Sequence, residues 1–107
     1  MPELSELNKT IVALNDLWPL LEGEERKSIL DKRDSLNEKA SELAHKTLRE
    51  DVPELNDAIN QLNFATQAAK EAKASIDDIS ARMIKVADTV KKVSGAIGKV
   101  GDLIAVL

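Results

Sequence analysis

Residues 76–107 read IDDISARMIKVADTVKKVSGAIGKVGDLIAVL, and their apolar pattern decides the fold of this chain. Apolar residues recur here at alternating intervals of three and four, at Ile76, Ile79, Met83, Val86, Val90, Val93, Ile97, Val100, Ile104 and Leu107. A repeat that averages about 3.5 residues is typical of helices that pack in a left-handed, coiled-coil-like manner. The stretch therefore predicts a long amphipathic helix with one apolar seam that must be covered.

Two segments nearer the N-terminus show related patterns. In residues 3–18 and just beyond, the apolar positions are Leu4, Leu7, Ile11, Leu14, Trp18 and Leu21. In residues 24–49 the seam is Ile29, Leu36, Ala40, Leu43 and Thr47. Arg33 either breaks this second seam or lies at its solvent-facing edge. Pro19 ends the first helix, because a proline ring clashes with the carbonyl one turn earlier. Trp18 is expected to anchor this hairpin in the core, and an exposed contact for a partner is the alternative.

A third helical segment covers residues 53–107. Its early seam, Leu55 to Ala69, is out of phase with the seam from Ile76 by three residues. Such a shift locally overwinds a coiled coil, and Ser75 to Asp78 could cap a new helix. We favour one continuous helix, since neither glycine nor proline occurs between Pro53 and Gly95. A break near Ser75, which would give four helices, is the alternative.

Three glycines recur near the end of the chain, at Gly95, Gly98 and Gly101. Each costs about 1 kcal/mol in a helix interior relative to alanine. The spacing favours a helix that weakens after Ser94, and close packing against a partner helix is the other interpretation.

These patterns predict an all-α fold: a single domain, residues 1–107, that forms an antiparallel, coiled-coil-like bundle. A continuous last helix would be about twice as long as residues 24–49. Its second half, the seam from Ile76 to Leu107, would then lack an intramolecular partner. Exposed apolar surface of that size normally marks an interface. We therefore expect a protein–protein interaction module that assembles through this seam, most simply as a homo-oligomer.

Composition excludes several classes of site. The chain has 107 residues and a formal net charge of −4, with 2% aromatic residues, no cysteine and one histidine. Disulfides, thiolate metal sites and a cysteine nucleophile are excluded by the missing cysteine. No nucleophile and base can be paired into a catalytic constellation, so we expect neither an enzyme nor a cofactor, a metal or a small-molecule substrate.

Two weak chemical motifs are better explained by helix surfaces. Glu42 and His45 have the Glu-x-x-His spacing of di-iron bundles, and Glu38 lies one turn earlier, but that site needs the motif twice. The acidic pairs Glu24–Glu25, Glu50–Asp51 and Asp77–Asp78 sit at helix starts or on polar faces, where capping and solubility account for them. We interpret both motifs as solvated surface.

The charge distribution leaves other functions open. Residues 1–80 carry 10 basic and 17 acidic side chains, whereas residues 81–107 carry five basic and two acidic ones. An acidic body could steer binding to a basic partner, as a small inhibitor or immunity-type protein does. The basic, apolar residues Val93–Leu107 could instead dock on an anionic membrane surface. The lack of an aromatic stacking platform argues against nucleic acid as a partner.

The polar, acidic N-terminus does not resemble a signal peptide, and a cytoplasmic location is expected.

Overall fold

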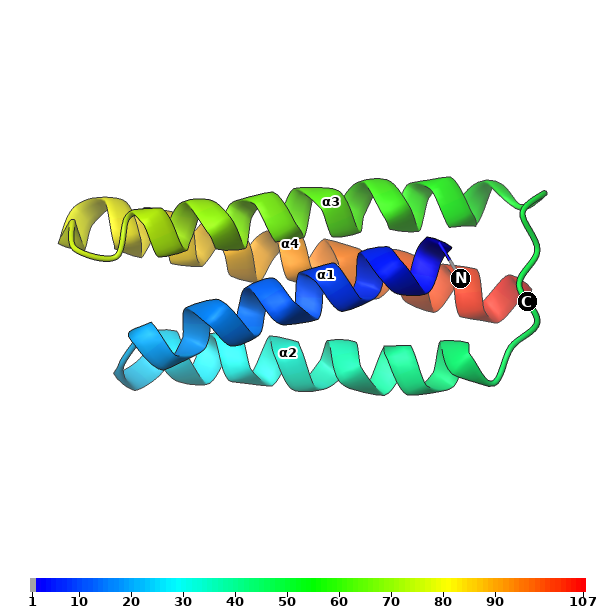
Figure 1. Ribbon diagram of the computed structural model, residues 1–107, viewed down its shortest axis with the longest axis horizontal. Helices are drawn as coiled ribbons and strands as arrows, with labels where there is room; N and C mark the ends of the chain where they lie inside the picture. Colours follow the sequence, from blue (N-terminus) through cyan, green and yellow to red (C-terminus); the bar gives the residue numbers. More distant parts are fainter. Residues whose placement is uncertain (1) are drawn as a thin grey trace.

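The computed structural model describes residues 2–107, with side chains from Ser5 onward (Figure 1). This part of the chain forms α1 (Pro2–Leu17), a turn of 3-10 helix η1 (Trp18–Leu20), α2 (Gly23–Ala44), α3 (Pro53–Ala74) and α4 (Ile79–Val106). The predicted all-α class and bundle architecture are confirmed. The bundle measures 43 × 19 × 18 Å, so every helix runs along the long axis.

The expected continuous third helix is wrong, and the alternative break near Ser75 is correct. The α3 helix ends at Ala74. The N–H of the next residue, Ser75, donates to the carbonyls of Glu71 and Ala72. The Asp78 side chain then caps α4 by accepting a hydrogen bond from the Ala81 N–H at 3.1 Å. The physical reason is the three-residue phase shift, because one straight helix cannot present both seams to a single partner. Folding back at this turn covers the second seam inside the same chain.

The weakening expected after Ser94 does not interrupt the last helix. The α4 helix continues without interruption to Val106 through all three glycines. Val93, Val100 and Leu103 are almost fully buried on this part of the helix. Tertiary packing of an apolar face contributes most of the stability of a helix in a protein, so it outweighs the low helix propensity of glycine here.

The connections produce two hairpins that pack on each other. The α1–α2 and α3–α4 hairpins are antiparallel, as the short joints predict (Figure 1). Residues 45–52 cross the end of the bundle diagonally, so α3 packs on α1 and α4 packs on α2. The neighbours that come from different hairpins, α1 with α3 and α2 with α4, consequently run parallel. This arrangement creates two parallel helix pairs, and each of them borders a surface cleft.

The core repeats every seven residues on each helix. Fully or almost fully buried side chains occupy these heptad positions: Leu7, Leu14 and Leu21; Ile29, Leu36 and Leu43; Leu55, Leu62 and Ala69; Val86, Val93 and Val100. Large residues on three of the helices meet small ones on α3, where Ala58, Ala65 and Ala72 are also buried. Small side chains let two helices approach closely, and α3 makes its most extensive contacts with α4.

Several positions assigned to the earlier seams lie elsewhere. The side chain of Leu4 is outside the described residues. The α2 helix ends at Ala44 instead of residue 49, and Thr47 is exposed in the linker. Leu48 still packs partly against the core, which ties the linker to the bundle.

Trp18 is half-buried between two arginines of α2. The Arg26 and Arg33 guanidinium carbons lie 5.5 and 6.0 Å from the centre of the indole ring. The indole N–H donates to Asn15, and Arg33 donates to the same amide oxygen. The tryptophan therefore packs against the core as expected, and Arg33 interrupts its seam because it covers this ring.

Thr10 is a fully buried polar residue at the α1–α3 contact. Its Oγ1 lies 2.7 Å from Oγ1 of Thr66 and 3.2 Å from the Leu62 carbonyl oxygen. The Glu6 carbonyl oxygen, one turn earlier on α1, is 3.0 Å away. The proton of the Thr10 hydroxyl therefore always has an acceptor. The pair of hydroxyls, Thr10 on α1 and Thr66 on α3, aligns these two parallel helices at one level.

Replacing Thr10→Val should destabilise the fold by about 1 to 2 kcal/mol, because a buried hydroxyl partner is removed while the shape is kept. The double variant T10V/T66V should lose less than the two single variants together, since both partners are then apolar. Urea unfolding followed by circular dichroism measures both values. Equal stability of T10V and the natural chain would contradict this account of the contact.

The linker carries an ion pair that shifts a pKa. Arg49 donates to both carboxylate oxygens of Asp51, at 3.2 and 2.9 Å. The Arg49 hydrogen bonds are the main reason that the pKa of the Asp51 carboxyl is below its ordinary value. A lowered folded-state pKa means that the charged carboxylate stabilises the folded linker above the unfolded-state pKa. That contribution is lost as the pH falls through the folded-state value.

We expect Arg49→Ala to raise the pKa of the Asp51 carboxyl toward its ordinary range, because its two hydrogen-bond donors are removed. Carbon-detected NMR of the side-chain carboxyls over a pH series measures the shift. Arg26→Ala is the matched control, since it removes a guanidinium at the other end of the bundle. An Asp51 titration that is the same in both variants would contradict the assignment.

Candidate functional site

The predicted interface residues do not form one exposed surface. Val86, Val93 and Val100 are buried in the core of the chain itself. Five more pack partly against that core: Ile76, Val90, Ile97, Ile104 and Leu107. Ile79 and Met83 are the two seam residues that stay largely exposed, at 64% and 59%. The expectation that this seam lacks an intramolecular partner is wrong for most of its length, because α4 folds back on α3 and α2.

An exposed apolar patch remains at the start of α4, at the end of the bundle where α2 also begins. It consists of Ile79, Met83, Ile84 and Ala87, and Ile84 is 69% exposed. Ile79, Met83 and Ala87 follow one another at intervals of one helical turn, so they lie on one face of the helix. We call these four residues the α4 patch.

A cleft of about 480 Å³ lies beside the α4 patch, between α2 and α4. From α4 it is lined by Arg82, Met83, Val86, Ala87 and Val90, and from α2 by Glu24, Glu25 and Ser28. Its α4 wall is therefore mostly apolar and its α2 wall is polar. Met83 belongs to both the patch and the cleft, which makes them one continuous surface.

Two of the residues that line this cleft form an ion pair with each other. The Arg82 Nε donates to Glu25 Oε1 at 3.2 Å, and each side chain is about a quarter exposed. The other oxygen, Glu25 Oε2, is buried without a hydrogen-bond partner in the part of the chain that the structure describes. The pair links the first turns of α2 and α4, so it fixes the parallel alignment of these two helices.

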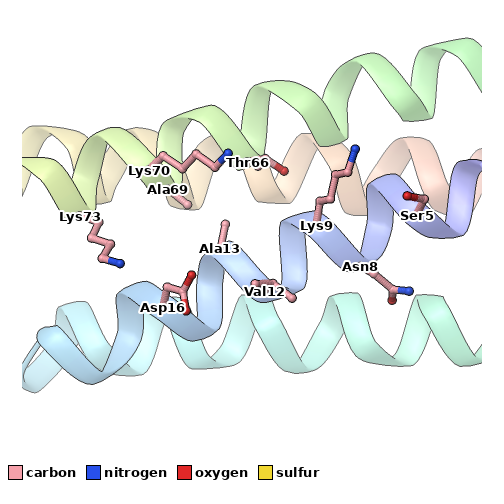
Figure 2. A pocket seen from close by; sticks show the side chains of 10 residues that line it. All are labelled: Ser5, Asn8, Lys9, Val12, Ala13, Asp16, Thr66, Ala69, Lys70 and Lys73. Atoms are coloured by element: carbon pink, nitrogen blue, oxygen red, sulfur yellow. The ribbon is translucent and has the colours of Figure 1, made fainter.

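A second and larger cleft, of about 830 Å³, lies between α1 and α3 (Figure 2). Ala13 and Ala69 point toward one another across its floor, and both are buried. Lys9 and Asp16 extend from α1, and Lys70 and Lys73 extend from α3. Ser5, Asn8, Val12 and Thr66 complete the lining. Nothing in the periodicity of the sequence indicated this cleft, because its walls come from residues about sixty positions apart.

The other sequence motifs stay apart from both clefts. Glu38, Glu42 and His45 are exposed on the last turns of α2. Among the side chains of residues 5–107, no three histidine or acidic groups lie close enough together to hold a metal ion. The pairs Glu24–Glu25 and Glu50–Asp51 lie at opposite ends of the 43 Å bundle. Exposed acidic residues of α2, among them Asp31 and Glu38, lie between these two pairs.

The last helix faces inward where a membrane contact was considered. Val93, Val100 and Leu103 are buried in the core, so their apolar surface is already used. No helix within residues 2–107 combines the length and apolar character needed to cross a bilayer.

Comparison of the chain with models of known protein families, with curated proteins and with solved structures found no match. The interpretation of these surfaces therefore depends on their own chemistry.

Replacing Arg82→Met should destabilise the fold by about 1 kcal/mol, because the half-buried Glu25 carboxylate loses its partner. The double variant R82M/E25M should recover this loss or exceed the stability of the natural chain, since two apolar side chains then fill the same place. Thermal and urea unfolding give both values. A double variant that is less stable than R82M alone would show that the ion pair has no such role.

Proposed function

We propose that this chain is a non-enzymatic helical interaction module, and that the α4 patch with the adjoining α2–α4 cleft binds a second copy of the chain. The observation that supports the proposal is the exposure of Ile79, Met83 and Ile84 together on one end of one helix. Three large apolar side chains in water on neighbouring turns are costly, and covering them is favourable by about 25 cal/mol per Å².

The shape of the surface supports a two-fold arrangement. A symmetric dimer needs one patch that is complementary to itself. Here a projecting, flexible methionine lies beside a cleft with an apolar wall, so Met83 of each copy can fill the cleft of the other. Methionine suits this role because its unbranched side chain adapts to irregular gaps. The proposed interface is thus reduced from the whole seam to its two largely exposed residues, Ile79 and Met83, and their neighbours.

Neither of the other two functions has an equivalent contact in its favour. Capture of a basic partner would use the acidic side chains of residues 1–80, of which Glu25 and Asp51 are already paired with arginines. Membrane docking through Val93–Leu107 would require α4 to leave the core. Self-association needs no rearrangement of the fold, and we therefore favour it.

The absolute mass in solution tests the proposal, measured by light scattering on a sizing column over a concentration series. We expect about twice the chain mass of 11.7 kDa for the natural chain at high concentration. The variant I79E/M83E should be monomeric, and its unfolding midpoint should match that of the natural chain at dilutions where the natural chain is also monomeric, because both side chains are exposed in the protomer. Aspartate at the buried positions Val86 and Val93 would unfold the protomer and could not test the interface.

The matched control is F64E/V106E, which places two glutamates at exposed apolar positions away from the α4 patch. This variant should associate like the natural chain. A natural chain that stays monomeric at every concentration, or an I79E/M83E variant that still dimerises, would refute the proposal.

A further inference from the structure

The α1–α3 cleft has a charge opposite to that of the segment in which it lies. Residues 1–80 carry seven more acidic than basic side chains, since 17 minus 10 is seven. The charged residues that line the cleft are nevertheless three lysines and one aspartate, Lys9, Lys70, Lys73 and Asp16. The cleft is thus a locally cationic groove on an acidic protein, and such a groove attracts negative charge.

The three lysines differ in their ion pairing among the described side chains. Lys9 forms an ion pair with Glu6 on the same helix, with 3.4 Å between Lys9 Nζ and Glu6 Oε1. Among side chains of residues 5–107, neither Lys70 nor Lys73 forms an ion pair, and both are exposed on α3. Their ammonium groups are therefore free to pair with carboxylates of another molecule that enters the cleft (Figure 2).

The floor of the cleft is apolar. Ala13 and Ala69 present only methyl groups at this floor, and the cleft has a volume of about 830 Å³. Val12, 57% exposed, adds an apolar wall on α1. A ligand that fills this space must bury apolar groups against the floor while it presents negative groups to the lysines on both walls.

The length and the walls of the cleft indicate the shape of the ligand. The lining residues on α1 run from Ser5 to Asp16, which is about three helical turns. Both walls are α-helices, whose backbone groups are already paired, so a β-strand has no edge to join. An amphipathic helix laid into a groove between two helices is a recurrent mode of peptide recognition, and it suits a groove about three turns long with an apolar floor. Its apolar stripe would lie on the alanine floor, and flanking acids would meet the lysines.

We propose that the α1–α3 cleft is a docking site for an amphipathic helix of a partner protein, one that carries acidic side chains on both flanks of its apolar stripe. The cleft lies on the α1–α3 side of the bundle and the α4 patch on the α2–α4 side, so this site does not depend on self-association. A duplex nucleic acid would also meet the lysines, but the apolar floor favours a helix with apolar side chains.

The test uses a synthetic helical peptide about three turns long, with leucines along one face and glutamates on both flanks. A second peptide carries lysines in place of the glutamates. Two-dimensional amide NMR of the isotope-labelled full chain locates binding. We expect the glutamate peptide to shift the amides of Ala13, Thr66 and Ala69, with binding that weakens as salt is raised. The lysine peptide should leave these amides unchanged.

The variant K70E/K73E should weaken binding of the glutamate peptide about tenfold or more, because two attractive pairs become repulsive. The matched control K27E/K91E changes net charge equally at two exposed lysines outside the cleft, and it should bind like the natural chain. No shift at the cleft, equal binding of both peptides, or equal weakening by the two variants would overturn the proposal. A cleft that binds duplex DNA but not the peptide would also overturn it, as would loss of self-association in K70E/K73E, which would assign the cleft to a second copy.

Discussion

The rest of the structure depends on burial of the α4 seam against the alanine-rich face of α3. This contact is possible because the chain turns back at Ser75 to Asp78 and antiparallel packing then brings Val86, Val93 and Val100 inside. The small residues of α3 allow the close approach that gives dense packing, which a core needs to gain dispersion as well as apolar burial. The α3–α4 hairpin in turn supplies the surface on which α1 and α2 lie.

The diagonal linker has a second structural consequence. It makes α1 and α3 parallel neighbours, and likewise α2 and α4, so that each pair must be aligned by contacts of its own. A buried hydroxyl pair at Thr10 and Thr66 aligns the first pair, and the Arg82–Glu25 ion pair aligns the second. Both surface clefts lie along these parallel pairs. The interaction surfaces that we propose are thus a result of how the two hairpins are connected.

The two proposed surfaces differ in chemistry. The α4 patch is exposed apolar surface next to an apolar wall, a combination suited to a self-complementary contact. The α1–α3 cleft has a small apolar floor, and one wall carries two lysines that form no ion pair with the described side chains, which suits an acidic helix. A chain with both properties can join two copies of itself and still leave a free groove on each copy. Such an arrangement is suited to bringing partner helices together.

The sequence by itself determined that the chain is all-helical, where most of its core lies and where the first joint falls, because helix periodicity and proline sterics act over a few residues. It also contained two signals for a break within residues 70–80, a phase shift of the apolar seam and a capping aspartate. The absence of glycine and proline in this region nevertheless led us to favour a continuous helix, which is wrong. Only the tertiary structure decided the fold-back at Ser75, the continuation of α4 through Gly95, Gly98 and Gly101, and the diagonal crossing. Each of these depends on burial against residues distant in sequence. The lysine-lined cleft was decided in the same way, since its two walls meet only when α1 and α3 lie side by side.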